Sequence, residues 1–394
     1  MHFNKGQERG LKILGDFYYS NELVIEYGGL PGTGKTTLLM EFIRRHNIPL
    51  SRVAPMTYVG QASLVLRSKG FTNAKTIHSW NYEPVETPLK VNGEIVMDTY
   101  MNKPKMVTTF VPVKIDNMDL LVIDEGRMVP DSMKDHIEKH NIKTIVCGDP
   151  GQLPPVFGKP AYLNNPAFVL DEIMRQEAHS AKLYLADRAR KGLPIHKGFY
   201  GDVYVIDEDE LNHDMVVNSD IVICGTNKTR NNINDYVRKS VFRTDSDLPL
   251  RGEKMVCRKN NWKIGIGGIN LTNGMRGTIL NHPDVAGFNG NTYSIDFMPD
   301  MLDTLYFENL LCDYHYLNGS LDKRKEIKQS KYYKGEKMEF GYAITTHLSQ
   351  GSEYMNGVYI EEVFDTSIHS NLLNTGITRF KGNLIFVKQK RKYY

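Results

Sequence analysis

The sequence has few cysteines, no long apolar run and little excess charge of either sign. Its four cysteines are far apart, and none has the CxxC spacing or the nearby histidine of a zinc finger, so we expect neither a disulfide framework nor a zinc site. No apolar run approaches the ~18 residues of a membrane span, and the first ten residues lack the apolar core of a signal peptide. These absences predict a folded protein that works in a reducing compartment without a membrane anchor.

Charge and composition exclude little else. A formal net charge of +3 over 394 residues permits nucleic-acid binding but lacks the strongly basic balance that would indicate it. Hydrophobic residues make up 41% and charged residues 24%, which is average for a globular protein and excludes a disordered or fibrous chain. The length fits two core domains with insertions.

The order of apolar runs and turn signals predicts two α/β domains. A strand at 23–27, a glycine-rich turn at 28–34 and a helix at 35–46 open the first domain. Because further apolar strands alternate with helices, we expect a parallel sheet buried on both faces. The remaining elements expected are strands at 53–54, 120–123 and 144–147, and then, for the second domain, a helix at 180–191 and strands at 221–224 and 384–387.

Two segments interrupt this rhythm. Residues 81–117 contain four prolines and alternate apolar with polar residues, and residues 247–337 carry Asn-Gly turn signals, so we expect both to be β-rich insertions. The predicted fold class is therefore α/β, with two domains and two small β insertions. The expected limits are 1–80 with 118–170, 81–117, 171–246 with 338–394, and 247–337.

A phosphate-binding loop is predicted at residues 29–36. The run Gly-Leu-Pro-Gly-Thr-Gly-Lys-Thr matches G-x4-G-K-[ST] without a mismatch and lies between a strand and a helix. Backbone N–H groups would hold the phosphates, Lys35 would reach the β and γ oxygens, and Thr36 would ligate Mg²⁺. The alternative is a glycine-rich turn with an incidental lysine. The residues expected to contact ATP are Gly29, Pro31, Gly32, Thr33, Gly34, Lys35, Thr36 and Thr37.

Two acidic residues follow the apolar run 120–123. The carboxyl edge of a parallel sheet would bring Asp124 and Glu125 beside the phosphates. Asp124 would hold Mg²⁺, partly through water, and Glu125 would orient and deprotonate the attacking water. A paired acid fits hydrolysis better than transfer to a bound substrate. The alternative is that these acids only cap the next helix.

Residues 148–156, Gly-Asp-Pro-Gly-Gln-Leu-Pro-Pro-Val, resemble motif III of superfamily 1 helicases. The ending is similar to the B branch, which includes RecD-like enzymes and the phage Dda helicase. This resemblance implies two RecA-like domains in tandem, 1A and 2A, with 81–117 as a 1B wedge and 247–337 as an SH3-like 2B insertion. Segments that resemble the other motifs follow in the family's order: 54–57, 76–79, 170–176, 226–230, 252–256, 342–353 and 374–379.

The resemblance also implies roles around the nucleotide. Gln7 resembles the glutamine that reads adenine, and Gln152 would sense the γ-phosphate. Arg175 and Arg379 would reach the γ-phosphate from the second domain, whereas an arginine without this context is usually a solvated surface residue. The segment that resembles motif V adds Gly351 and Glu353 to the expected nucleotide site.

A single-stranded track needs polar groups directed at the backbone and aromatic platforms for bases. Trp80 and Trp262 could serve as platforms or pack in the core, and His78 and His347 could contact the strand or be buried and hydrogen-bonded. The basic runs 323–337 and 388–394 could contact phosphates or stack bases, but such runs are usually solvated faces, which is what we expect here. The predicted strand contacts are Pro55, Thr57, Tyr58, Thr76, His78, Ser79, Thr226, Asn227, Asn273, Thr346 and His347.

Four residues depart from the family pattern. Arg127, Leu348, Asn374 and Gly376 stand where a small residue, a lysine, a tyrosine and an alanine are common. None of these departures removes a group that touches phosphate. We therefore expect ATPase chemistry to survive, while strand contacts or coupling could differ.

These features predict an ATP- and Mg²⁺-dependent helicase that moves 5′→3′ along single-stranded DNA and opens duplex DNA at forks. We expect a cytoplasmic monomer, in a bacterium or a phage-infected host, that serves replication, recombination or repair. A single-strand-binding protein or a replisome component is an expected partner. Two alternatives stay open: an RNA helicase of the same superfamily, and a P-loop switch that binds nucleic acid without moving along it.

Overall fold

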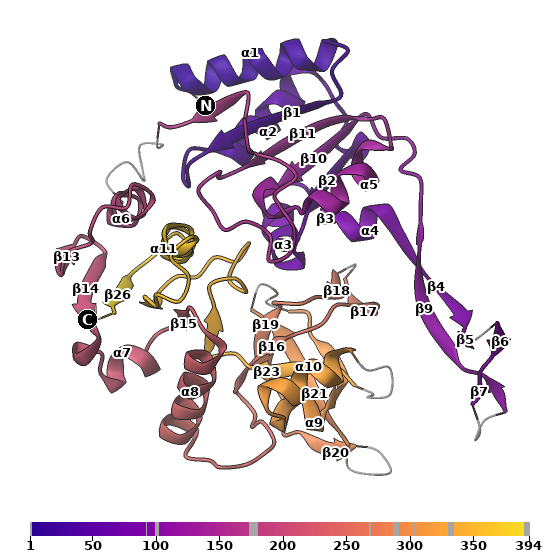
Figure 1. The fold of residues 1–394 in the computed structure, drawn as a ribbon, viewed down its shortest axis with the longest axis vertical. Helices are drawn as coiled ribbons and strands as arrows, with labels where there is room; N and C mark the ends of the chain where they lie inside the picture. The colour runs from indigo at the N-terminus through magenta and orange to yellow at the C-terminus, as the bar shows by residue number, and fades with distance from the viewer. Residues whose placement is uncertain are drawn as a thin grey trace.

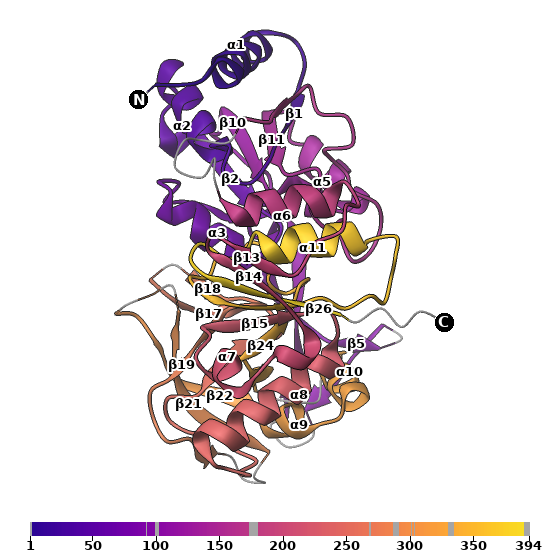
Figure 2. The same cartoon turned by 90° about the vertical axis from the view of Figure 1, so that its left-hand side faces the viewer.

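The computed structural model describes residues 2–91, 93–98, 102–172, 180–267, 269–286, 291–300, 302, 304–329 and 335–389. Two α/β sheets, an antiparallel sheet and a long β ribbon make up the molecule (Figures 1 and 2). Within the described ranges, no helix is both long and apolar enough to cross a membrane.

The first sheet has six parallel strands in the order β12-β1-β11-β10-β2-β3. Its strands are β1 (Val24–Gly29), β2 (Val53–Thr57), β3 (Lys75–Thr76), β10 (Leu120–Asp124), β11 (Lys143–Gly148) and β12 (Phe168–Leu170). The helices of this domain are α1 (Lys5–Tyr19), α2 (Lys35–Arg45), α3 (Gly60–Ser68), α4 (Ile77–Asn81) and α5 (Lys134–Glu138). The four predicted strands and the helix after the phosphate loop are confirmed, whereas α1 was not anticipated.

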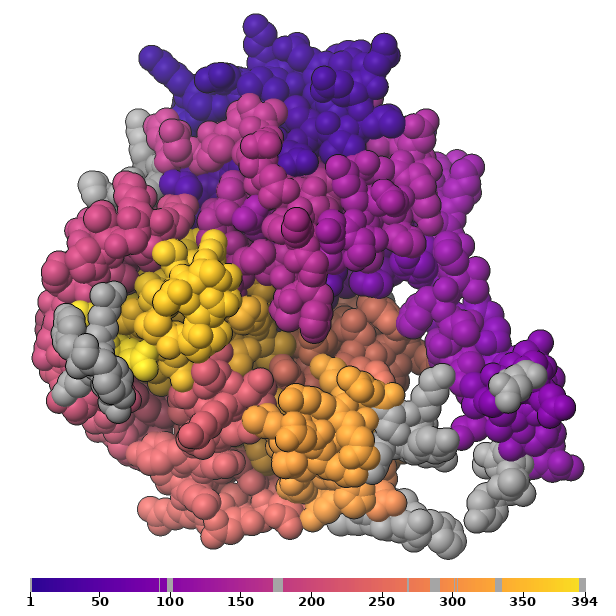
Figure 3. Space-filling view, viewed as in Figure 1, coloured from indigo at the N-terminus to yellow at the C-terminus, as the bar shows by residue number. Residues whose placement is uncertain are grey.

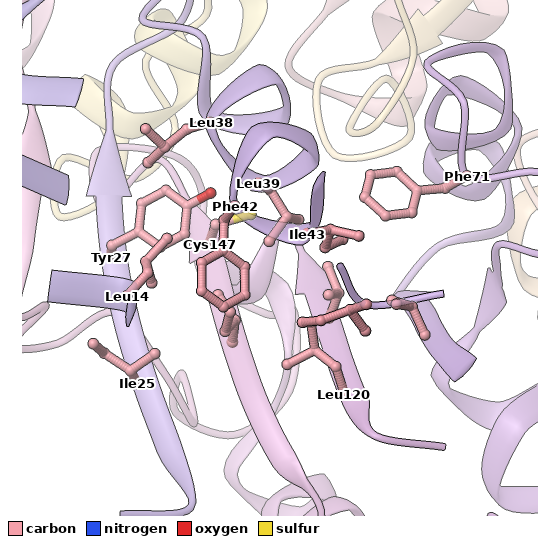
Figure 4. Packing of buried hydrophobic residues seen from close by; sticks show 14 of the residues in the cluster. Leu14, Ile25, Tyr27, Leu38, Leu39, Phe42, Ile43, Phe71, Leu120 and Cys147 are labelled. Atoms are coloured by element: carbon pink, nitrogen blue, oxygen red, sulfur yellow. The ribbon is translucent and has the colours of Figure 1, made fainter. Parts of the chain in front are cut away.

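Apolar side chains cover both faces of this sheet, as expected for buried parallel strands. On one face, Leu14 of α1 and Phe42 of α2 pack against Tyr27 and Leu120 (Figure 4). On the other face, α4 and α5 contribute to a second buried cluster. The sheet therefore holds its carboxyl edge rigidly, and the phosphate loop lies at that edge.

The second sheet has the order β13-β14-β26-β25-β15-β24 and is parallel except for β13. Helices α6 and α11 pack on one face, and α7 and α8 on the other. The predicted helix at 180–191 and the strands at 221–224 and 384–387 are confirmed. The elements are β13 (Gly198–Tyr200), β14 (Val203–Asp207), β15 (Ile221–Cys224), β24 (Ala343–Thr345), β25 (Gly357–Ile360), β26 (Leu384–Lys388), α6 (Ala181–Arg190), α7 (His213–Val217), α8 (Asn227–Val237) and α11 (His369–Ile377).

Both interrupting segments contain the predicted β structure. In the first, β4 (Tyr82–Pro88) and β9 (Met106–Pro112) form an antiparallel ribbon that projects from the first domain (Figure 1). Four short strands continue it: β5 (Lys90–Val91), β6 (Glu94–Ile95), β7 (Met97–Asp98) and β8 (Lys103–Pro104). The second segment has β16 (Lys254–Cys257), β17 (Asn261–Ile266), β18 (Ile269–Leu271), β19 (Arg276–Ile279), β20 (Asp284–Ala286), β21 (Thr292–Pro299), β22 (Phe307–Asp313) and β23 (Met338–Phe340).

Two short helices in the second segment were not predicted, namely α9 (Tyr314–Asn318) and α10 (Leu321–Gln329). The expectation that the basic run 323–337 is a solvated face holds for Lys325, whose side chain is 75% exposed, but is wrong for Arg324 and Lys337. Arg324 turns inward to donate to the carbonyl of Leu317 (2.6 Å), and Lys337 is 3% exposed with its Nζ 2.8 Å from an oxygen of Asp313. Both charges find partners that a sequence run does not reveal. Residues 330–334 and 390–394 of the two basic runs lie outside the described residues.

Candidate nucleotide site and nucleic-acid interface

The phosphate loop follows β1, and at the far end of the loop Gly34 adopts left-handed geometry (φ 78°) directly before α2. Lys35 folds back so that its Nζ donates to the carbonyls of Gly29 (3.0 Å) and Leu30 (3.1 Å). The Lys35 carbonyl in turn accepts from the hydroxyl of Tyr27 (2.9 Å). The ammonium group of Lys35 is thus bound only by neutral carbonyls. A phosphate in the loop would attract it more strongly than these carbonyls do, because the phosphate carries a full negative charge.

Gln7 anchors α1 to the phosphate loop. Its side chain is fully buried, and its Nε2 donates to the carbonyl of Thr33 (3.1 Å). Its Oε1 accepts from the backbone N–H of Asn4 (3.1 Å), which completes a capping box at the start of α1. The position beside the loop fits a residue that reads a nucleotide base, a role that stays a prediction.

Strands β1, β11 and β10 are neighbours, so their carboxyl ends bring the phosphate loop and the acidic pair to one edge. Asp124 accepts from the Sγ–H of Cys147 (3.3 Å) and from the backbone N–H of Glu125 (3.0 Å). Burial raises the pKa of Cys147 well above its usual range, so the sulfur stays a neutral donor. Asp124 is therefore oriented from two sides.

Glu125 is held in left-handed backbone geometry (φ 57°), a strained conformation for a residue with a side chain. Its Oε2 is buried and has no hydrogen-bond partner. Burial raises the pKa of Glu125, the Asp124 carboxylate adds to the rise, and the charges of Arg379 and Lys35 oppose it. These influences place two cations from different domains within electrostatic reach of one unsatisfied carboxyl group.

Asp149 ties the turn after β11 to the second domain. The side chain is fully buried, and its Oδ1 accepts from the N–H of Gly151 (2.8 Å). From the second domain, Asn374 donates to its Oδ2 (3.2 Å) and Arg190 approaches its Oδ1 (3.7 Å). One carboxylate therefore fixes both the turn and the contact between domains.

The same turn makes further hydrogen bonds to the second domain. Asn371 donates to the carbonyl of Gln152 (3.1 Å), and the N–H of Leu153 donates to Thr375 Oγ1 (3.2 Å). Gln350 donates to the carbonyl of Leu153 (3.3 Å). The side chain of Gln152 is 3% exposed, and its Oε1 has no partner. A movement of the second domain would therefore shift the turn that contains Gln152 through these hydrogen bonds.

Arg379 lies two residues after the end of α11 and is 6% exposed. Its guanidinium donates to the carbonyls of Thr375 (3.0 Å) and Ser352 (3.3 Å). The other predicted arginine, Arg175, lies outside the described residues. Of the two, only Arg379 can be placed beside the acidic edge.

Gly351 and Glu353 lie where the two domains meet. A Cβ on Gly351 would come within 2.7 Å of the Cβ of Ala62 in α3, so the close approach requires glycine. Glu353 pairs with Lys381 (2.5 Å) and, across the interface, with Lys69 (3.9 Å). These contacts serve the domain interface, and a role in nucleotide binding stays a prediction.

Several predicted strand contacts use their side chains internally. Thr57 and Thr346 are fully buried, and their hydroxyls donate to the carbonyls of Val59 (2.9 Å) and Cys224 (3.2 Å). Pro55 is buried too, and its carbonyl accepts from Trp80 Nε1 (3.0 Å). Trp80 thus packs against the first domain, as its core interpretation predicted. A strand could reach these positions only through backbone groups or neighbouring side chains.

Around α4, the predicted contacts form a local cap. The hydroxyl of Thr76 accepts from the N–H of Ser79 (3.2 Å) and lies 2.9 Å from its Oγ. His78 keeps exposed surface, but partial desolvation by the residues around it lowers its pKa, and the charge of His136 adds to this effect. His347 is half-buried, and burial lowers its pKa likewise. Both histidines are therefore neutral near pH 7.

In the second domain, Thr226 caps α8, and Asn227 is exposed beside it. The carboxylate of Glu362 accepts from the N–H of Thr226 (2.8 Å) and the hydroxyl of Thr229 (2.6 Å), so an acid of the chain already occupies this helix start. Asn273 is half-buried, and its Oδ1 has no hydrogen-bond partner.

Sequence reasoning missed the residues that join the domains: Asp149, Arg190, Asn371, Asn374 and Thr375. The sequence held one signal. Asn374 stands where a tyrosine is common in the family, and its side-chain amide can donate a hydrogen bond to a carboxylate. The neighbouring departure also has a structural reason. A Cβ on Gly376 would lie 1.9 Å from the ring of Tyr359, so the helix can pack here only with glycine.

Among the described residues, no group of three or more histidine, cysteine or acidic side chains could hold a metal by itself. A magnesium ion bound mainly by phosphate oxygens needs fewer protein ligands. Thr36 in the first turn of α2 and the Asp124 carboxylate at the end of β10 fit such an ion.

The phosphate loop, the acidic edge and the paired sheets define a P-loop protein with two RecA-like domains in tandem. The sequence profile of the AAA domain family matches residues 2–209, more than half of the chain, and the protein belongs to that family. No curated protein matches the chain by sequence.

Solved structures of Pif1 helicases share the fold over nearly the whole chain. The Pif1 helicase from Bacteroides, in complex with ADP-AlF3 and single-stranded DNA, is 15% identical with a TM-score of 0.56, covering 98% of this chain and 92% of that one. The Pif1 helicase from Candida albicans is 14% identical with a TM-score of 0.54, covering 98% and 94%. A Pif1 structure described for unwinding at forked duplex DNA is 17% identical with a TM-score of 0.57, covering 98% and 92%.

Proposed function

We propose that the protein is an ATP-driven helicase that moves 5′→3′ along single-stranded DNA and separates duplex DNA at forks. The observation that carries this proposal is the set of hydrogen bonds between the turn after β11 and α11, which brings Arg379 within electrostatic reach of Glu125. A site assembled from two domains makes hydrolysis depend on domain closure, and closure is the movement a motor needs.

In this proposal, Lys35 and the loop backbone bind the ATP phosphates. Thr36 and Asp124 would hold Mg²⁺, and the ion would supply positive charge against the phosphates. Glu125 orients the attacking water and accepts its proton. Gln152 senses the γ-phosphate, and Arg379 stabilises the transition state. The domain limits predicted from the sequence are part of the proposal.

DNA is favoured as the track because the Pif1 structures that share the fold include a complex with single-stranded DNA and one described for DNA unwinding at forked duplex DNA. The direction rests on the resemblance to superfamily 1B motifs. An RNA track is the competing possibility. A switch that does not move is disfavoured, because such a protein needs no arginine supplied by a second domain.

Adding oligo-dT is expected to raise the steady-state rate of ATP hydrolysis, because strand binding favours domain closure. Lys35→Ala should remove the stimulated rate, while the exposed Lys139→Ala in the same domain should keep it. The measurement is phosphate release with and without oligo-dT or poly-U. If neither polymer changed the wild-type rate, the result would favour the P-loop switch that does not move along nucleic acid. Stimulation by poly-U alone would favour an RNA helicase.

The direction predicts which partial duplex is opened. A duplex with a 5′ single-stranded DNA tail should be unwound with ATP, and the same duplex with a 3′ tail should stay paired. Strand separation followed by fluorescence tests both substrates under one condition. Opening of the 3′-tailed substrate alone would show that the direction is wrong.

A further inference from the structure

Four rings lie in a row on the first domain, from the end of β2 to the root of the β4–β9 ribbon. The centroids are 6.3 Å apart for Tyr58 and His78, 6.1 Å for His78 and Tyr82, and 5.7 Å for Tyr82 and His136. Four different elements supply these rings: the turn after β2, α4, β4 and α5. The first two rings belong to the predicted strand contacts, whereas the last two have no assigned role.

Local hydrogen bonds fix the two unassigned rings. The hydroxyl of Tyr82 lies 2.7 Å from Nδ1 of His136. The residue before Tyr82 is locked as well, because Asn81 donates to the carbonyl of Ile77 (2.9 Å) and lies 2.8 Å from Nε2 of His140. Rings that are already fixed lose little conformational entropy when a ligand binds.

These rings keep exposed surface. His78 is exposed, and Tyr58, Tyr82 and His136 are half-buried. None of the three neighbouring pairs is stacked face to face, since their planes are tilted by 49°, 31° and 49°. Aromatic side chains with open surface in a row are the platforms on which proteins stack unpaired bases.

The row lies beside an opening in the molecule. Figure 3 shows this opening between the ribbon and the unit that contains β16–β23, and Figure 1 places α4 and the start of β4 at its end nearest to the first domain. An ion pair between Glu86 of β4 and Lys263 of β17 bridges the two sides. A strand that passed through this opening would run past α4 and reach the root of the ribbon.

We propose that Tyr82 and His136 bind unpaired bases of a single strand, extending the row that begins with Tyr58 and His78. The proposal rests on the proposed function, because it assumes a single-stranded track on the first domain. The new element is the position at which the single strand reaches the β4–β9 ribbon. At this position the protein binds a base and not a phosphate.

The test compares oligo-dT with an abasic oligonucleotide of equal length. Tyr82→Ala is expected to weaken binding of the full-length protein to oligo-dT about 5- to 100-fold, the range for losing one base–aromatic stack. Binding to the abasic oligonucleotide should stay at the wild-type level. Tyr82→Phe, which keeps the ring, should retain most of the affinity. Fluorescence anisotropy measures all of these affinities.

Two further variants keep the test decisive. Phe199→Ala removes an exposed ring that stacks on Tyr204 at the far edge of the second sheet, and it should leave both affinities unchanged. Tyr82→Leu replaces Tyr82→Ala if thermal unfolding shows that the smaller residue disrupts the fold. Equal loss on both oligonucleotides, or no loss on either, would overturn the role of Tyr82 in base binding. A wild-type protein that binds neither oligonucleotide would instead overturn the proposed function.

Discussion

Replacing Arg379 by alanine is expected to lower kcat for strand-stimulated ATP hydrolysis about 10³-fold, as for an arginine that reaches phosphate across a domain cleft. The guanidinium is buried, and the hydrogen bonds described for it go to neutral oxygens of Thr375, Ser352 and Thr378. Its charge opposes the rise that burial causes in the pKa of Glu125, so it acts on the acidic edge. A buried cation without a paired carboxylate is costly, and a bound γ-phosphate would offset that cost.

Two variants separate the charge of Arg379 from its shape and from general effects. Arg379→Lys keeps the charge but loses the planar fork, and it should recover little of the lost rate. Arg44→Ala removes an exposed arginine that pairs with Glu41 on α2, and it should hydrolyse ATP at the wild-type rate. ATP binding, followed with a fluorescent analogue, should persist in all three proteins. If Arg379→Ala kept the stimulated rate, the second domain would not complete the site.

The nucleotide site could be predicted because its parts are local. Residues 29–36 form the phosphate loop from consecutive positions, and Asp124 and Glu125 directly follow the apolar run 120–123, which predicts a buried strand. Both segments then meet at one edge of the sheet, because the carboxyl ends of neighbouring parallel strands lie side by side. The contact between Asp149 and Asn374 is not local, since the two residues are 225 positions apart, and the unusual amide at position 374 does not by itself identify its partner.

The strand track was harder to predict, because a residue type does not tell which way its side chain points. Thr57 and Thr346 have the right chemistry, yet both hydroxyls bond to carbonyls inside the protein. The ring row shows the opposite case. Tyr82 and His136 come from separate segments that carry no motif, and only the packing of α4, β4 and α5 brings them together.

The environment of the basic run on α10 was also hard to predict, because a residue type does not tell which way its side chain points. A pattern of lysines and arginines predicts a solvated face, because most such charges are exposed. Arg324 instead joins Arg230 and Arg258 around Glu339, at 3.6, 3.0 and 3.2 Å. These four residues come from distant parts of the chain, so the sequence gives no sign that they meet.

Glu339→Gln is expected to destabilise the protein by about 3–5 kcal/mol, because removing one partner leaves buried charges uncompensated. Glu339 is 4% exposed, and Arg230 is 1% exposed. Burial alone would raise the pKa of Glu339, but the three arginines outweigh it and lower the pKa. The carboxylate therefore contributes stability above its unfolded pKa, and this contribution is lost as pH falls through the lowered folded value.

Thermal unfolding at neutral pH measures this effect. The midpoint of Glu339→Gln should fall by roughly 6–20 °C if the unit unfolds like a domain of 150–250 residues. The matched control is Glu326→Gln, whose carboxylate pairs with Lys323 at the surface of α10, and it should change stability by less than about 0.5 kcal/mol. Because three guanidinium groups would repel one another once the carboxylate is gone, added phosphate or sulfate should restore part of the lost midpoint. Equal midpoints for the two variants would mean that the arginines are compensated by solvent and not by Glu339.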